Sequence, residues 1–154
     1  MVTVAQLRAF ARESNMIEGI KDPARHRIHA EALETFVYSP GYLSINVVET
    51  FVSRIQPSAY LRTKPEDMVM IANHIPPKPS DMLPKFKYLL ECVNKGLISA
   101  YNAHVQYEIL HPFIDGNGRS GRALWLRMMI LNGWDMRRGF LHEFYYQTLD
   151  NSRR

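Results

Sequence analysis

The sequence has little cysteine, little excess charge and no long apolar run. Its single cysteine, Cys92, excludes an internal disulfide framework and a zinc site built from cysteines. No apolar stretch reaches the roughly 20 residues that a membrane-spanning helix needs. The N-terminus lacks the basic and then apolar layout of a secretory signal peptide. We therefore expect a cytoplasmic protein without a membrane partner.

Length and composition favour one folded domain. The chain has 154 residues, of which 46% are hydrophobic and 22% charged, which excludes a disordered or low-complexity chain. We expect a single domain over residues 1–154. Nineteen Lys and Arg against fifteen Asp and Glu give a net charge of +4. Because these cations are scattered, we expect no nucleic-acid interface, and the oligomeric state stays open.

Apolar residues at helical spacing predict a mainly α-helical fold. Thr3, Asp22 and Ser44 precede three of these patterns and are typical helix N-caps. The predicted helices cover about residues 3–17, 23–37, 45–55, 86–96, 98–111, 119–132 and 140–149.

Prolines dominate the segment between the third and fourth of these helices. They surround a short apolar run, which predicts one strand or a small surface hairpin within about residues 60–77. An exposed strand edge is either a liability or a docking site, so this run could pair with a target or simply pack. The run consists of Met68, Val69, Met70, Ile71 and Ala72.

The segment 111–122 has the composition of an anion-binding loop. A helix is expected to end near Leu110, because Pro112 cannot continue its hydrogen-bonding pattern. Gly116, Asn117 and Gly118 tolerate positive φ, and a new helix is expected from about Arg119. Inward-pointing N–H groups and the positive end of that helix would together hold an anion.

The side chains of this loop suit a metal-bound polyphosphate. Arg119 and Arg122 lie three apart on one helical face, where two like charges favour an anion between them. Asp115 can hold Mg²⁺ through one carboxylate. His111 has the side chain whose ordinary pKa lies near neutrality, so it can accept a proton. These groups predict nucleotidyl or phosphoryl transfer without a Walker A motif.

Residues 111–122 resemble the signature of the Fic (filamentation induced by cAMP) family. That signature is His-x-Phe-x-Asp/Glu-Gly-Asn-Gly-Arg-x-x-Arg, and every fixed position is filled here. The resemblance extends over most of the chain. It implies a helical bundle with a β-hairpin flap beside the active site.

The resemblance also implies the activity of a protein adenylyltransferase. Such an enzyme transfers AMP from ATP to a Tyr, Thr or Ser hydroxyl of a target protein, itself included, and releases pyrophosphate. His111 would deprotonate the hydroxyl, and Asp115 would hold Mg²⁺. Glycine rather than lysine at position 118 favours AMP transfer over phosphoryl transfer. The implied phosphate ligands are Gly116, Asn117, Gly118, Arg119 and Arg122.

A second motif near the N-terminus is similar to the inhibitory pattern Ser/Thr-x-x-x-Glu-Gly/Asn of this family. Ser14 and Glu18 fill it, and their spacing of four puts them on one helical face. The resemblance implies that Glu18 pairs with Arg122 and occupies the place of the γ-phosphate. We therefore expect the subclass with an N-terminal inhibitory helix, over about residues 3–19.

Other interpretations remain open at this point. Tyr145 and Tyr146 would contact adenine by the resemblance, although aromatic residues at helical spacing also serve as core. The same site could hydrolyse AMP from a modified target, with Glu18 positioning water. The chain could also be a non-catalytic nucleotide-binding module or the toxin of a toxin–antitoxin pair.

Overall fold

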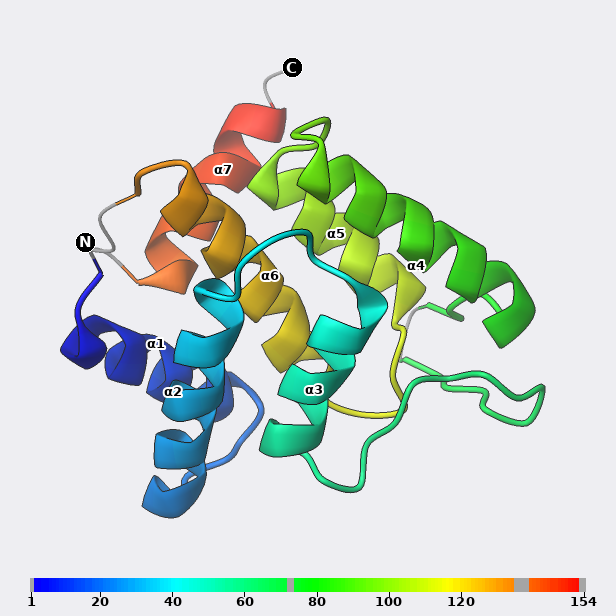
Figure 1. Ribbon diagram of the computed structural model, residues 1–154, viewed down its shortest axis with the longest axis horizontal. Coiled ribbons are helices and arrows are strands. Elements are labelled where there is room, and N and C mark those ends of the chain that lie inside the picture. The colour runs from blue at the N-terminus through cyan, green and yellow to red at the C-terminus, as the bar shows by residue number, and fades with distance from the viewer. Residues whose placement is uncertain (1, 72–73, 135–138, 153–154) are drawn as a thin grey trace.

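A computed structural model of the chain describes residues 2–71, 74–134 and 139–152. The described residues contain seven helices, which confirms the mainly α-helical class (Figure 1). They are α1 (Val4–Ile17), α2 (Pro23–Val37), α3 (Ile45–Ile55), α4 (Pro79–Asn94), α5 (Ala100–Leu110), α6 (Asn117–Leu131) and α7 (Phe140–Ser152).

Helix α6 lies at the centre of the arrangement. It packs against α1, α2, α3 and α5 (Figure 1). Its residues are buried on all sides from Arg119 to Met128, as expected for a helix enclosed by other helices. Trp125 on α6 and Tyr107 on α5 are among the largest fully buried side chains. The first turn of α6 is therefore held rigidly by the surrounding helices.

The predicted bounds of α1, α2 and α3 are confirmed, together with their caps. The Thr3 side chain accepts from the Gln6 backbone N–H, and Gln6 reciprocates, forming a capping box. The Asp22 and Ser44 side chains accept N–H groups in the first turns of α2 and α3. Local sequence therefore determines these three helices.

Helix α4 begins seven residues earlier than predicted. Pro79 occupies the first helical position, where its missing N–H costs nothing. Pro84 lies inside the helix one turn later, and there it removes one intrahelical hydrogen bond. The predicted start of this helix at residue 86 was therefore wrong, because Pro79 and Pro84 lie within the first two turns of α4.

The predicted β-hairpin flap is not found among the described residues of segment 60–77. Met68, Val69 and Met70 form no strand, Ala72 lies outside the described residues, and Ile71 makes only an isolated antiparallel bridge to His74. A second isolated bridge joins Leu61 to Phe113. The described part of the segment therefore offers no regular strand edge to a target.

Side chains take the backbone groups that a hairpin would pair. The Asp67 carboxylate accepts the N–H groups of Thr63 and Lys64 at 3.0 Å each, which folds the chain into a turn. Arg62 donates to the carbonyls of Asp67 and Pro77 at 3.3 and 3.0 Å. These groups are therefore not available to a strand ladder.

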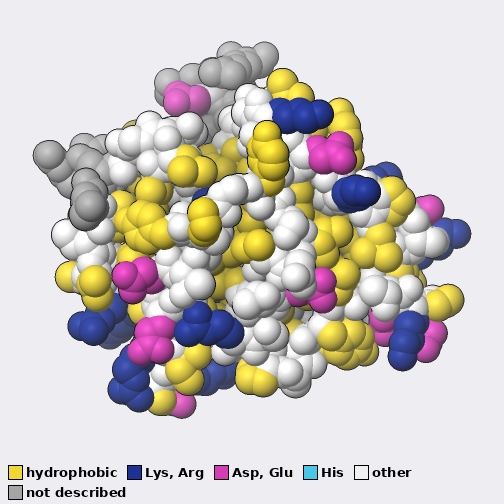
Figure 2. All heavy atoms as spheres, viewed as in Figure 1, with side chains coloured by type: hydrophobic (Ala, Val, Ile, Leu, Met, Phe, Trp, Pro, Cys, Tyr) yellow, Lys and Arg dark blue, Asp and Glu magenta, His cyan; other side chains and the backbone are white. Residues whose placement is uncertain are grey.

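No helix in the described part of the chain is long and apolar enough to cross a membrane. On the face shown in Figure 2, Lys and Arg are interspersed with Asp and Glu around the periphery.

Candidate functional site

The bend between α5 and α6 begins at His111 in an unusual backbone conformation. His111 is the C-cap of α5 with φ 48° and ψ 63°, and no other described non-glycine residue has positive φ. This left-handed region costs roughly 1 kcal/mol or more for a residue with a side chain. Such a conformation persists only where the surrounding structure holds it, so the neighbours of His111 are informative.

Arg62 holds the end of α5 in place. Its Nε donates to the His111 carbonyl at 2.7 Å and its Nη2 to the Leu110 carbonyl at 2.8 Å. Arg62 is 0% exposed, and its remaining nitrogen binds carbonyls of segment 60–77. One guanidinium thus fixes the bend and the neighbouring segment together. The sequence analysis missed Arg62, because a single arginine in a proline-rich segment carries no periodic signal.

The rest of the bend is closed by Asn117. Its Oδ1 accepts the Phe113 N–H at 2.9 Å, and its Nδ2 donates to the Phe113 carbonyl at 2.8 Å. Gly116 precedes α6 with φ 79°, a value that suits glycine. The Asn117 side chain is therefore committed to the loop, and only its backbone is left to face a phosphate.

A cavity of about 470 Å³ opens beside this bend. Asp115 is exposed at its edge, where its Oδ1 accepts the Gly116 N–H at 2.7 Å. The structure thus brings most of the signature residues into one hollow, together with residues from α2 and from the end of α3. The lining residues are Glu18, Ile20, Arg25, Gln56, Ile71, His111, Ile114, Asp115, Gly116, Asn117, Gly118 and Arg119.

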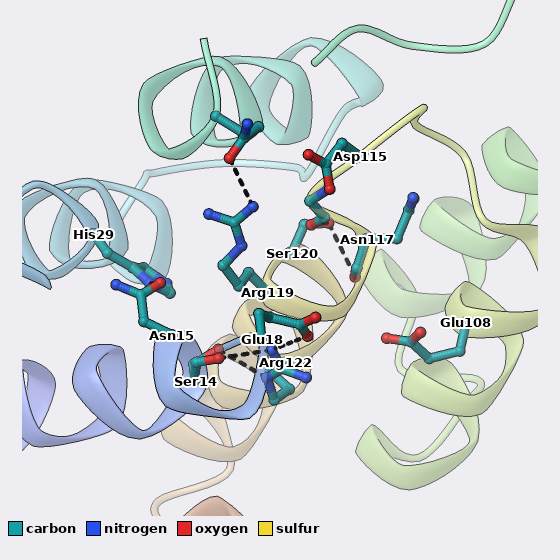
Figure 3. A network of polar contacts seen from close by, with 12 residues as sticks. Ser14, Asn15, Glu18, His29, Glu108, Asp115, Asn117, Arg119, Ser120 and Arg122 are labelled. Atoms are coloured by element: carbon teal, nitrogen blue, oxygen red, sulfur yellow. Dashed lines mark hydrogen bonds and ion pairs between the residues drawn. The ribbon is translucent and has the colours of Figure 1, made fainter. Parts of the chain in front are cut away.

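Arg122 is bound by the end of α1. Its Nε donates to Ser14 Oγ at 2.8 Å, and its Nη2 donates to the Ser14 carbonyl at 2.9 Å. The same Nη2 lies 2.6 Å from Glu18 Oε1, an ion pair shown in Figure 3. Asn15, next to Ser14, fixes α1 on α2: its Oδ1 accepts from His29 Nδ1 at 2.8 Å, and its Nδ2 donates to His26 Nδ1 at 2.9 Å.

Gly118 allows the Glu18 carboxylate to approach α6. A Cβ at position 118 would collide with Glu18 Oε1 and come within 3.1 Å of Arg122 Nη1. Any side chain at this position would therefore push the carboxylate away from Arg122.

Arg119 has a different environment from Arg122. Its Nη1 donates to the Ile55 carbonyl at 3.3 Å and its Nη2 to Gln56 Oε1 at 3.0 Å. Its Nε is buried without a hydrogen-bond partner among the described residues. Arg119 is only 4% exposed, and no described carboxylate forms an ion pair with it. The carboxylates of Asp115 and Glu18 therefore act on Arg119 only from a distance.

The cations around the site affect both nearby histidines. Burial lowers the pKa of His111, and the charges of Arg62 and His74 lower it further, while Asp115 opposes them. Burial lowers the pKa of His29 to about 3, and Arg119 and Arg122 add to this. His111 is therefore neutral near pH 7, which is the form that accepts a proton.

Glu108 on α5 is a second carboxylate near Arg122 that the sequence analysis missed. Figure 3 shows it pointing from α5 toward Glu18 and Arg122. Its Oε1 is buried without a hydrogen-bond partner among the described residues. Burial and then the charge of Glu18 raise its pKa, against the lowering effect of Arg122, to about 7.

Several predicted residues are not brought to the cavity. Tyr145 and Tyr146 lie on α7 with 59% and 50% of their surface exposed, and neither lines the cavity. Met68, Val69 and Met70 also lie outside its lining, and Ile71 is the only described residue of the predicted flap run that reaches it.

Comparisons with known proteins place this chain in a family. The model of the Fic/DOC family matches residues 26–129. The protein adenylyltransferase Fic of Drosophila grimshawi is 30% identical over 90 residues, which are 54% of this chain and 18% of the relative. A probable protein adenylyltransferase of Aquifex aeolicus is 27% identical over 119 residues, which are 71% of this chain and 32% of the relative. This chain therefore spans a third or less of the length of these two relatives. The family match includes the whole bend and begins after Ser14 and Glu18.

Proposed function

This chain belongs to the Fic/DOC family, and on that basis we propose that it is a protein adenylyltransferase. It transfers AMP from ATP to a Tyr, Thr or Ser hydroxyl of a protein target. The observation that carries this proposal is the cavity that unites His111, Asp115 and Arg119 at the N-terminus of α6. The names of the relatives support it, because one is named a protein adenylyltransferase and the other a probable protein adenylyltransferase.

In the proposed reaction His111 is the general base. Its neutral imidazole takes the proton of the acceptor hydroxyl as that oxygen bonds to the α-phosphorus. The bond from the α-phosphorus to the bridging oxygen breaks, and its electron pair leaves with pyrophosphate. The backbone N–H groups at the start of α6 and the Arg119 guanidinium offset the phosphate charge.

Asp115 suits Mg²⁺ as a single protein ligand. Its carboxylate is exposed at the edge of the cavity, and only Oδ1 has a hydrogen-bond partner among the described residues. The described residues hold no group of three or more His, Cys, Asp or Glu that could bind a metal ion. Mg²⁺ commonly uses one carboxylate and completes its octahedron with phosphates and water. When bound, it would neutralise charge on the phosphates.

We further propose that Glu18 inhibits the enzyme. Its carboxylate and Ser14 together occupy the Nε and Nη2 donors of Arg122, which a γ-phosphate would otherwise use. Asn15 anchors this end of α1 to buried His29. The inhibitory contact is therefore built into the fold.

Intact-protein mass spectrometry tests the proposed function. Glu18→Gly protein incubated with ATP and Mg²⁺ should gain one AMP unit, whereas the wild type gains much less. Glu18→Gln, which keeps the size but not the charge, should give an intermediate gain. The gain should vanish when His111→Ala is added, because general base catalysis contributes about 10²–10⁴-fold.

Two results would contradict the proposal. An adduct that forms equally in wild type and Glu18→Gly would remove the inhibitory role of Glu18. Absence of any adduct on the variant, or on added candidate targets, would remove the transferase. Release of AMP from a pre-modified target would assign the site to hydrolysis instead.

A further inference from the structure

A second arginine, outside the signature, lines the cavity together with Arg119. Arg25, in the first turn of α2, donates from Nη2 to Gln56 Oε1 at 2.8 Å. Arg119 on α6 donates to the same oxygen at 3.0 Å. All three residues line the cavity that contains His111. Arg25 stands immediately before the residues matched to the family, and neither Arg25 nor Gln56 belongs to the signature.

These two arginines are held together by a neutral side chain, and no described carboxylate lies within ion-pair distance of them. Gln56 offers a neutral amide oxygen to both guanidinium groups. Burial lowers the pKa of Arg119 and the charges of Arg25 and Arg122 add to this, while the more distant carboxylates of Asp115 and Glu18 oppose it. Two like charges in a partly buried place repel each other unless an anion lies between them.

The guanidinium groups of Arg25 and Arg119 carry the donors that an anion in the cavity would meet. Gln56 Oε1 accepts from one terminal nitrogen of each, at 2.8 and 3.0 Å. The Nε of Arg119 is buried, so a ligand in the cavity reaches Arg119 through its terminal nitrogens. A ligand with several negative oxygens suits two neighbouring forked guanidinium groups.

We propose that Arg25 and Gln56 complete, with Arg119, a subsite for the terminal diphosphate of the nucleotide, which becomes the pyrophosphate leaving group. The role of this subsite in a reaction rests on the proposed adenylyl transfer. Arg25 binds the oxygens of this group, and Gln56 keeps the two guanidinium groups in position when the ligand is absent. Because Glu18 occupies Arg122 and not Arg25 or Arg119, pyrophosphate meets only the Arg25 and Arg119 contacts of the subsite in the inhibited protein.

Isothermal titration of the full chain with inorganic pyrophosphate tests the subsite without any reaction. Arg25→Gln should weaken binding about tenfold, which corresponds to the loss of one charge-assisted contact. Arg27→Gln is the matched control, since Arg27 lies on the same helix, carries the same charge and is exposed. It should change the affinity less than about twofold, as for exposed charges. Equal effects of the two substitutions, or none from Arg25→Gln, would overturn the proposal.

A conservative variant separates binding from a purely structural role. Arg25→Lys keeps the charge but loses the forked geometry, so its affinity should lie between those of wild type and Arg25→Gln. Thermal unfolding should show all three variants folded, since Arg25 is only half-buried. A Lys variant that binds as weakly as Arg25→Gln would count against the charge of Arg25 as the cause.

Kinetics in the Glu18→Gly background separates this inference from the proposed function. Adding Arg25→Gln should raise the KM for ATP about tenfold. If Glu18→Gly transfers AMP and its KM does not respond to Arg25→Gln, the subsite is wrong and the function stands. If no AMP is transferred while pyrophosphate binding still responds to Arg25→Gln, the function is wrong and the subsite stands.

Discussion

The two signature arginines of α6 lie three residues apart, yet the chain treats them in opposite ways. Arg122 is paired with the Glu18 carboxylate, and a second carboxylate, Glu108, points toward it (Figure 3). Arg119 meets only the neutral oxygens of Ile55 and Gln56. Arg122 is therefore neutralised by a carboxylate in direct contact, whereas Arg119 has no described carboxylate within ion-pair distance and interacts with Asp115 and Glu18 only from further away. We refer to the surroundings of these two arginines as the Arg122 half and the Arg119 half of the site.

This difference indicates where the molecule regulates and where it binds. A carboxylate on an arginine competes directly with a phosphate for the same donors, so the Arg122 half is closed until Glu18 moves. A neutral amide holds the geometry of an arginine without cancelling its charge, so the Arg119 half remains attractive to an anion. A carboxylate in place of the amide beside Arg119 should therefore weaken anion binding there, and loss of the carboxylate beside Arg122 should allow it.

Gln56→Glu should make the two halves alike and has the largest expected effect. The substitution replaces one amide nitrogen by oxygen and places a carboxylate between Arg25 and Arg119, which both already donate to this side chain. Pyrophosphate affinity should fall about a hundredfold, since two charge-assisted contacts are then engaged internally.

Gln56→Met is the matched control for that substitution. It removes the hydrogen bonds and adds no charge, so the affinity should fall by only about a few fold. Titration calorimetry with pyrophosphate measures both variants. If Gln56→Glu binds pyrophosphate as well as Gln56→Met does, charge at this half of the pocket is not what attracts the anion.

Ser14→Ala should loosen the closed half. Ser14 is 1% exposed, and its hydroxyl accepts Arg122 Nε at 2.8 Å. Removing it leaves a buried charged donor unsatisfied, which should lower the free energy of unfolding by about 1–3 kcal/mol. Urea denaturation measures this. Ser53→Ala is the comparison, because Ser53 is exposed and bonds only within its own helix; its effect should stay within about 0.5 kcal/mol. Equal losses would show that the contact with Arg122 contributes little.

Glu108→Gln should change how the stability of the folded chain depends on pH. The pKa of Glu108 is raised from 4.5 to about 7 in the folded chain by burial and Glu18, against Arg122. The folded state therefore holds this proton more tightly than the unfolded chain, and stability falls as the pH rises from about 4.5 to 7. The variant does not ionise, so its Tm should exceed that of wild type more at pH 8 than at pH 5. A Tm difference that does not change with pH would contradict the raised pKa.

Sequence patterns predicted the parts of this molecule that local chemistry determines. Helices α1 to α3 follow from caps and apolar spacing within a few residues, and the bend follows from Pro112 and the glycines beside it. The spacing of Ser14 and Glu18 likewise predicted that both lie on one face, and the family resemblance implied the contact of Glu18 with Arg122 that the structure contains.

The remaining features depend on contacts between distant residues. Gln56 meets Arg119 across 63 positions and Arg25 across 31, so no local pattern could reveal that they share one oxygen. The hairpin was predicted from an apolar run, but Arg62, whose hydrogen bonds reach 48 and 49 positions along the chain, takes part of the backbone that it needed. Glu108 comes near Arg122 and Glu18 only through the packing of α5 against α6, which no local pattern predicts.

A crystal structure of the Glu18→Gly protein with ATP and Mg²⁺ tests the two-half account most directly. The account predicts a phosphate chain that contacts Arg119 and Arg122 together, with Arg25 turned from Gln56 toward the terminal phosphate. A nucleotide bound elsewhere, with Arg119 and Arg25 still on Gln56 and Arg122 still on Ser14, would contradict it.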